Sequence, residues 1–280
     1  MEYTLFSATG CARCKIVMRC MDEQGIAYEE YDFKAEGKNV FQQFYAANRS
    51  SVYRGPAGIE FPILTDGQVI KQGIGPALAW LKNGKALDGF FRIGVMRKEW
   101  IDGISVSSGD SNQGAAFLDV LRCLKKNAMK LVIETNGKNA AILESVMSEK
   151  LADKVIMHVL GPLSLYEVLA GERIEPQEIE QSLAAVARGC DYQFQTEVAP
   201  VRRQSGEYSY LTPGEIGETA RLIEMATSSK KQPYLVKLFQ TKANSAGTLP
   251  EPLTAQQLFP YRSAARAFQV MTEIEKDSPI

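Results

Sequence analysis

Two closely spaced cysteines near the start of the sequence constrain this chain more than any other feature. Cys11 and Cys14 follow the apolar run at 3–6 and open a segment whose apolar residues recur with a helical period. At a helix start, unpaired backbone N–H groups and the positive end of the helix dipole stabilise a thiolate, and Arg13 and Lys15 add positive charge. We therefore expect Cys11 to attack disulfides and Cys14, almost one turn later, to displace the resulting mixed disulfide.

The same Cys-x-x-Cys spacing also occurs in structural disulfides and in zinc sites. A tetrahedral zinc site needs two further ligands, whereas this chain has one histidine, His158, and no second Cys-x-x-Cys pair. Five cysteines without a signal peptide do not resemble a secreted disulfide framework. The spacing and its context therefore favour a redox or thiol role, and we expect no metal site.

The composition is that of a globular protein with no strong charge preference. The 280 residues are enough for one large or two ordinary domains. With 45% hydrophobic residues, 23% charged residues and a net charge of −1, nothing points to a nucleic-acid or membrane partner. No apolar run is long enough to span a membrane and no signal peptide is visible, so a cytoplasmic location is expected.

The first 84 residues are expected to alternate strands and helices. The expected elements are strands at 2–7 and 26–33, helices at 12–24 and 40–48, a hairpin joining 61–64 to 69–70, and a closing helix at 76–82. Asp66 and Gly67 supply the hairpin turn, and Gly25 is placed to end the first helix. The resulting order is β-α-β-α-β-β-α.

This order, with the dithiol after the first strand and Pro62 just before the third, resembles a glutaredoxin over residues 1–84. The resemblance implies a thioredoxin-like fold with a redox-active dithiol. It also implies a cis peptide bond before Pro62, the only kind of peptide bond for which cis is cheap. By the same resemblance, the residues that would bind substrate beside the dithiol are Arg13, Phe61, Pro62 and Gly73.

The sequence departs from the glutaredoxin pattern at two places that bear on the thiol it would use. The glutathione-binding glycine pair occurs as Gly73-Ile74-Gly75 without the usual acidic residue after it, and Ala8-Thr9 replaces the usual lysine before the dithiol. We expect exchange with a protein thiol or disulfide partner. Glutathione enters only as a transient thiol, with no tightly bound cofactor.

A second domain is expected over residues 85–280, after the break at Asn83-Gly84. Its buried-strand candidates are 103–107, 130–135, 154–159, 192–198 and 234–239. Helical patterns between most of them imply a parallel sheet with right-handed crossovers, as an open sheet or a partial barrel. A final amphipathic segment at 254–274 is expected to pack Leu258, Ala265, Phe268, Val270 and Met271.

Residues 100–274 contain a second ordered pattern, in the segments 103–110 with 117–118, 134–137, 153–163, 191–198 and 234–239. In this order the segments resemble the radical S-adenosylmethionine activating enzymes of pyruvate formate-lyase and anaerobic ribonucleotide reductase. The resemblance implies a partial parallel α/β barrel of the TIM type. Its mouth would be ringed by Ser108, Asn136, His158 and Glu197, since sites gather at the strand ends of barrels.

The positions that carry chemistry in that family are replaced here. The cluster motif with three cysteines is absent, and Ser108-Gly109-Asp110-Ser111 stands where the family has Gly-Gly-Glu-Pro. His158 and Leu160 replace an Asp and a Lys, and Lys237 and Gln240 replace a Gln and an Arg. We therefore expect a degenerate barrel that binds neither an iron–sulfur cluster nor S-adenosylmethionine. On a buried-strand pattern, His158 is also compatible with a hydrogen-bonded wall residue.

Two functions follow from these patterns. The first is a thiol–disulfide oxidoreductase, acting in electron transport, whose barrel domain recognises a partner or substrate. The second is a non-catalytic adaptor or iron–sulfur carrier of a radical-enzyme activation system, with Cys11 and Cys14 as ligands. The other cysteines, Cys20, Cys123 and Cys190, are expected to be buried small apolar residues. If the fusion of the two domains preserved the family geometry, Cys11 opens toward the barrel mouth.

Overall fold

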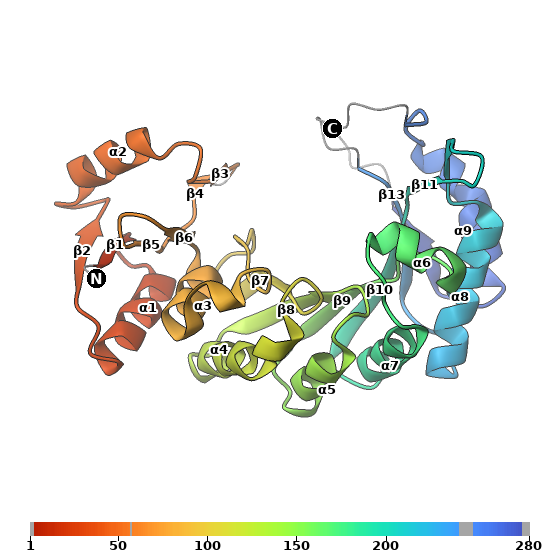
Figure 1. Ribbon diagram of the computed structural model, residues 1–280, viewed down its shortest axis with the longest axis horizontal. Coiled ribbons are helices and arrows are strands. Elements are labelled where there is room, and N and C mark those ends of the chain that lie inside the picture. Colours follow the sequence, from red (N-terminus) through yellow and green to blue (C-terminus); the bar gives the residue numbers. More distant parts are fainter. Residues whose placement is uncertain (1–2, 57, 241–248, 276–280) are drawn as a thin grey trace. The chain divides into compact units, whose positions relative to one another are not determined.

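The chain is a mixed α/β protein, described here from a computed structural model that covers residues 3–56, 58–240 and 249–275. It divides into two compact units, Met1–Ile133 and Glu134–Ile280, which are described separately (Figure 1). The division expected at residue 84 stays a prediction.

A four-stranded sheet forms the start of the first unit, in the order β2-β1-β5-β6 (Figure 1). Its strands are β1 (Tyr3–Ser7), β2 (Tyr28–Asp32), β5 (Ile63–Thr65) and β6 (Ile70–Gln72). β1 pairs in parallel with β2 and antiparallel with β5, which pairs antiparallel with β6. The strands confirm the expected elements, and a two-residue ladder of β3 (Arg54–Gly55) and β4 (Gly58–Ile59) is added.

Three helices accompany this sheet: α1 (Ala12–Glu23), α2 (Lys38–Ala47) and α3 (Ile74–Asn83). Gly25, with a φ of 65°, follows the end of α1 and allows the left-handed turn expected there. α3 starts two residues earlier than expected, directly after Gly73. An aromatic cluster fills the space beneath α2, with the ring centroids of Phe6 and Phe44 4.4 Å apart.

The segment expected to be a simple connection after residue 84 contributes to the core. It begins with the short helix η1 (Gly84–Leu87) and ends at β7 (Trp100–Ser105). The elements that follow β7 are η2 (Ser111–Gln113), α4 (Gly114–Lys126) and β8 (Lys130–Thr135). Phe90 is fully buried and stacks on Phe117 of α4 with ring centroids 4.4 Å apart. The connection is thus packed against the helix that follows it.

The second unit alternates helices with parallel strands. In chain order it contains α5 (Ala140–Ser148), β9 (Lys154–His158), α6 (Leu163–Ala170), α7 (Pro176–Ala187), β10 (Asp191–Val198), β11 (Pro200–Arg202), β12 (Tyr208–Tyr210), α8 (Pro213–Thr227), β13 (Tyr234–Leu238), η3 (Ala255–Leu258), α9 (Phe259–Arg266) and β14 (Thr272–Ile274). The pairs β9–β10, β10–β13 and β13–β14 are all parallel, while β11 and β12 form a separate antiparallel hairpin.

The order of the six-stranded parallel sheet is β14-β13-β10-β9-β8-β7, which confirms the expected parallel α/β arrangement. Each new strand is added beside the previous one in a constant direction, so right-handed crossovers place the connecting helices on one face. Along β10, Phe194, Thr196 and Val198 are buried and lie on one face of the strand. The other face carries Gln193 and Glu197, which are half-buried, and Gln195, which is 7% exposed.

The C-terminal segment differs from the expected amphipathic run. Leu258 and Ala265 are buried, but Val270 and Met271 are 50% and 57% exposed, because the helix ends before them. Gln269 follows the end of this helix, and its side chain is fully buried. It accepts a hydrogen bond from the backbone N–H of Gln232 and donates one to the backbone carbonyl of Ser229. The chain then continues as β14, a sixth strand that the apolar pattern did not reveal.

We expect Phe117→Ala to destabilise the protein by about 3–5 kcal/mol, because it removes a fully buried ring stacked on Phe90 and leaves a cavity. Urea unfolding followed by circular dichroism measures this loss. Phe259→Ala is the matched control, since that ring is 48% exposed and its loss should cost far less. Equal losses in the two variants would contradict the packing described.

Candidate functional site

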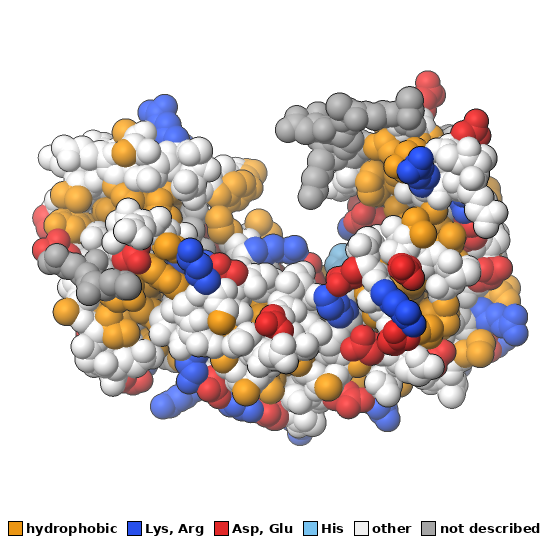
Figure 2. Space-filling model, viewed as in Figure 1, with side chains coloured by type: hydrophobic (Ala, Val, Ile, Leu, Met, Phe, Trp, Pro, Cys, Tyr) orange, Lys and Arg blue, Asp and Glu red, His pale blue; other side chains and the backbone are white. Residues whose placement is uncertain are grey.

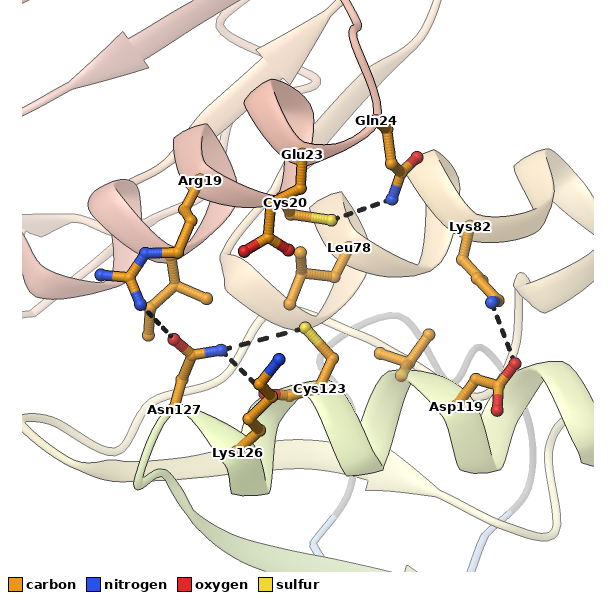
Figure 3. Close-up of a pocket in the computed structure, with 12 residues that line it drawn as sticks. Arg19, Cys20, Glu23, Gln24, Leu78, Lys82, Asp119, Cys123, Lys126 and Asn127 are labelled. Carbon is orange, nitrogen blue, oxygen red and sulfur yellow. Dashed lines mark hydrogen bonds and ion pairs between the residues drawn. The ribbon is translucent and has the colours of Figure 1, made fainter.

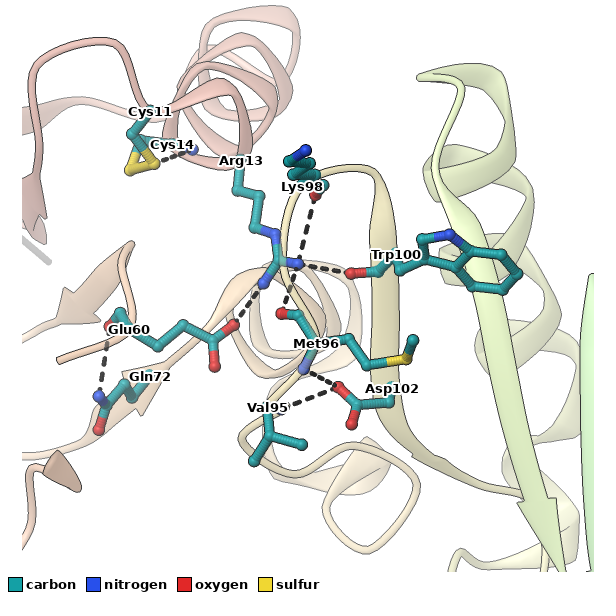
Figure 4. Close-up of polar contacts among 10 residues, drawn as sticks. All are labelled: Cys11, Arg13, Cys14, Glu60, Gln72, Val95, Met96, Lys98, Trp100 and Asp102. Carbon is teal, nitrogen blue, oxygen red and sulfur yellow. Dashed lines mark hydrogen bonds and ion pairs between the residues drawn. A yellow bond between two sulfur atoms is a disulfide. The ribbon is translucent and has the colours of Figure 1, made fainter. Parts of the chain in front are cut away.

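The two cysteines of the motif are joined by a disulfide at the start of α1 (Figure 4). Cys11 is the N-cap residue of α1, and its Sγ accepts a hydrogen bond from the backbone N–H of Cys14 at 3.1 Å. Cys14 is 1% exposed, whereas Cys11 is partly exposed. One sulfur is therefore accessible and the other is buried behind it.

The position of Cys11 favours negative charge on its sulfur after reduction. The first N–H groups of a helix lack intrahelical partners, and one of them already points at this Sγ. The positive end of the dipole of the 12-residue helix α1 acts in the same direction. Both effects stabilise the thiolate, which is the reactive form in disulfide exchange.

Arg13, between the two cysteines in sequence, points away from them into the protein (Figure 4). Its Nη1 lies 2.8 Å from Oε1 of Glu60, and the two side chains are only 10% and 6% exposed. Its Nη2 donates to the backbone carbonyls of Met96 at 2.9 Å and Trp100 at 2.5 Å, with Lys98 more distant at 3.4 Å. Protein groups thus surround this guanidinium, and its expected contact with substrate stays a prediction.

The carboxylate of Glu60 is buried away from solvent. Burial raises its pKa, while the charges of Arg13 and Arg97 act in the opposite direction. Within the described ranges, its Oε2 has no hydrogen-bond partner, so Arg13 supplies the main compensation. Gln72 donates to the backbone carbonyl of Glu60 at 3.2 Å and fixes the chain just before Phe61.

Three of the expected substrate-binding residues lie together. The peptide bond between Phe61 and Pro62 is cis, as the resemblance implies. The carbonyl of Pro62 accepts a hydrogen bond from the N–H of Gly73 at 2.8 Å. Phe61 belongs to the same apolar cluster as Cys14, and Cys11 packs against that cluster. Phe61 and the dithiol therefore share one packed cluster, to which Gly73 is joined through Pro62.

A groove of about 860 Å³, which sequence reasoning missed, adjoins this cluster. Its apolar lining includes the rings of Phe33, Phe41, Tyr45 and Phe61, and its charged lining consists of Lys34, Lys38 and Arg54. Phe33 stacks on Phe61 with centroids 4.6 Å apart. Its described lining residues include no acidic side chain. The groove is suited to an extended ligand with apolar groups and negative charge.

In the second unit, His158 lies at the end of β9 and its ring is partly exposed, visible as the pale blue atoms in Figure 2. Gln195, opposite it on β10, places Nε2 3.1 Å from the ring Nδ1. Glu134 approaches the ring Nε2 at 3.7 Å. The three side chains form a polar row across neighbouring strands, so His158 is both a hydrogen-bonded wall residue and accessible to a ligand.

The other residues expected at the barrel mouth are placed as follows. The hydroxyl of Tyr166 donates to the carbonyl of Asn136 at 2.6 Å and lies 3.5 Å from the carbonyl of His158, joining two strand ends. Glu197 is two residues after Gln195 on the same face of β10. In the first unit, Ser108 is exposed after β7, and its Oγ lies 2.9 Å from that of Ser105. Whether Cys11 opens toward the barrel mouth stays a prediction.

The remaining cysteines correct an expectation. Cys20, Cys123 and Cys190 are each partly exposed rather than buried. Cys20 and Cys123 both line a pocket bordered by charged side chains, which apolar periodicity does not reveal.

Among the described residues, no group of three or more His, Cys, Asp or Glu side chains could hold a metal ion. None of the helices in that part of the chain has the length and apolar character needed to cross a membrane.

No family model matches this chain, and no curated protein matches it. Among solved structures, it is similar to the crystal structure of endo-1,4-beta-mannanase from Eisenia fetida, at 12% sequence identity and a TM-score of 0.23. The alignment covers 56% of this chain and 55% of that chain, so this chain spans about half the length of the mannanase. At this TM-score the likeness carries no argument about fold or function.

Proposed function

We propose that the protein is a thiol–disulfide oxidoreductase that uses Cys11 and Cys14. The observation that carries the proposal is the pairing of a partly exposed, helix-capping Cys11 with a buried Cys14 in one disulfide. The strand order β2-β1-β5-β6 with α1 after β1 supports a thioredoxin-like fold for this part of the chain. In such an arrangement the exposed sulfur attacks and the buried sulfur resolves.

The proposed cycle starts from the reduced dithiol. The Cys11 thiolate attacks one sulfur of a substrate disulfide, forming a mixed disulfide and releasing the other sulfur as a thiolate, which takes up a proton. Cys14 then loses its proton and attacks Sγ of Cys11, which releases the second substrate thiol and forms the Cys11–Cys14 disulfide. The substrate gains the two electrons that the dithiol loses. Two thiols, from glutathione or from a protein dithiol, then return the Cys11–Cys14 disulfide to its reduced form and are themselves joined in a disulfide.

The groove beside the aromatic cluster supports a protein substrate. An extended peptide would place apolar side chains against Phe33 and Phe61, and negative charges near Lys34, Lys38 and Arg54. A groove of about 860 Å³ has room for more than one side chain of such a peptide. The substrate we propose is therefore a disulfide flanked by apolar and acidic residues.

The second unit is proposed to be the degenerate, TIM-like partial barrel. The consecutive parallel strands and the polar row of Glu134, His158 and Gln195 support this interpretation. Lys237 lies in register with Glu197 on the neighbouring strand, which adds charge of both signs to this face. We assign the face to recognition of the partner protein, with no S-adenosylmethionine and no iron–sulfur cluster bound there.

Cys11→Ser should abolish reduction of a small disulfide, because the accessible nucleophile is lost. Cys14→Ser should instead accumulate a mixed disulfide between Cys11 and the substrate, because the resolving sulfur is missing. A reduction assay together with mass spectrometry of the intact protein distinguishes the two variants. Cys190→Ser is the control and should keep full activity.

Wild-type activity in Cys11→Ser would contradict the proposed function. Anaerobic purification followed by iron analysis tests the iron–sulfur carrier directly. Iron bound in the wild type and lost in both Cys11→Ser and Cys14→Ser, without disulfide reductase activity, would favour the carrier.

Arg13→Met tests whether the buried ion pair supports the dithiol helix. Removing one partner of a buried pair leaves an uncompensated charge on Glu60 and should cost about 3–5 kcal/mol at neutral pH. The matched control is Arg173→Met, because its pair with Glu175 is exposed and should contribute at most about 1 kcal/mol. Urea unfolding of the three proteins measures both losses.

The cost of Arg13→Met should also depend on pH. The folded-state pKa of Glu60 is already raised, and loss of the neighbouring cation raises it further. Below the folded-state pKa of Glu60 in both proteins the carboxyl is neutral, so the extra penalty in the variant is absent, and above both pKa values it is complete. The difference from the wild type should therefore shrink as the pH falls through these two raised pKa values. A loss that stays constant over this range would contradict the role of Glu60.

A further inference from the structure

A second pair of cysteines lies apart from the Cys11–Cys14 disulfide. Cys20 belongs to α1 and Cys123 to α4, and both line one pocket of about 300 Å³ (Figure 3). Neither is in a disulfide, and both are partly exposed. Although 102 residues separate them in the chain, their side chains enter the same pocket from two different helices.

The two thiols affect each other's protonation more than any other neighbouring group does. The thiol of Cys20 is the largest cause of a pKa lowered to about 7 for Cys123. The thiol of Cys123 is in turn the largest cause of a raised pKa for Cys20. The shared pocket thus presents one thiol that ionises near neutral pH together with a second thiol that stays protonated.

Polar neighbours hold the pair in place. Gln24 donates from Nε2 to Sγ of Cys20 at 3.1 Å, and Asn127 places Nδ2 4.0 Å from Sγ of Cys123. Arg19 donates to Oδ1 of Asn127 at 3.1 Å, which links α1 directly to α4 (Figure 3). One hydrogen bond thus joins the two helices beside the sulfurs.

The charged groups around the pocket include both signs. The cations are Arg19 on α1, Lys82 on α3 and Lys126 on α4, and the anions are Glu23 on α1 and Asp119 on α4. Lys82 and Asp119 form an ion pair at 2.9 Å. Lys126 and Lys82 favour a thiolate at Cys123, and Glu23 opposes it.

We propose that Cys20 and Cys123 are a redox modification site that forms a reversible disulfide in the presence of hydrogen peroxide. The site lies outside the Cys11–Cys14 pair and does not depend on the proposed oxidoreductase activity. Its disulfide would join the helix that carries Cys11 and Cys14 covalently to α4.

The reaction is balanced with peroxide as the oxidant. The Cys123 thiolate attacks one peroxide oxygen, the O–O bond breaks, and a sulfenic acid forms while hydroxide takes up a proton to become water. Cys20 then loses its proton and attacks the sulfenic sulfur, forming the S–S bond and releasing a second water. Two thiols and one hydrogen peroxide thus give one disulfide and two waters, and a thiol such as dithiothreitol reverses the change.

The test uses the full chain with Cys11→Ser and Cys14→Ser combined, so that the first pair cannot contribute. Trypsin cleaves after Arg19 and after Arg122, which places Cys20 in peptide 20–34 and Cys123 in peptide 123–125. After peroxide treatment and alkylation, mass spectrometry should show these two peptides linked, and dithiothreitol should separate them. The rate of their formation should rise as the pH increases through about 7, the pKa of Cys123.

Two further variants sharpen the result. In Cys20→Ser, oxidation should stop at a sulfenic acid on Cys123, which dimedone traps. In Cys190→Ser, the matched control, the linked peptide should form at the unchanged rate. If Cys20→Ser does not fold, the linked peptide in the protein that carries only Cys11→Ser and Cys14→Ser tests the proposal.

Three outcomes would overturn the proposal. One is oxidation of Cys123 no faster than that of Cys190, with no linked peptide. Another is linkage found only in disulfide-joined dimers. The third is a linkage rate that does not change with pH around 7. Because the first dithiol is absent from this protein, none of these outcomes bears on the proposed oxidoreductase activity.

Discussion

The arrangement around the dithiol depends on the buried guanidinium of Arg13. A buried charge is costly unless an opposite charge and hydrogen-bond acceptors surround it, and here Glu60 and the carbonyls of residues 96–100 provide both. These partners come from the segment before the cis-proline and from the approach to β7. One side chain therefore joins the helix that presents the sulfurs to both the strand region beneath it and the chain that follows.

The same helix brings two kinds of sulfur chemistry together. At its N-terminus, unpaired N–H groups and the helix dipole favour a thiolate at Cys11. Further along the helix, Cys20 contributes a thiol that lowers the pKa of Cys123 on another helix. The first effect is local to one helix, whereas the second depends on packing between helices. A disulfide between Cys20 and Cys123 would thus link α1, whose N-terminus carries Cys11 and Cys14, covalently to α4.

In the second unit, the polar row of Glu134, His158 and Gln195 follows from strand alternation. Residues such as Phe194 and Thr196 face the helices and are buried, so their neighbours in sequence must face the other way. Parallel pairing then aligns those neighbours across β9 and β10. With the core on one face of the sheet, Gln195 and His158 therefore lie side by side on the other.

The sequence by itself determined the local elements and the dithiol at a helix start. Helical and strand periods, turn residues and the Cys-x-x-Cys spacing are properties of neighbouring residues, so they can be recognised without the fold. Only the tertiary structure decided that Arg13 meets Glu60, that Cys20 and Cys123 line one pocket, and that β14 adds a sixth strand. These arrangements join residues far apart in the chain, and no local pattern encodes which distant side chain will satisfy a buried charge, line the same pocket or pair with a sheet edge.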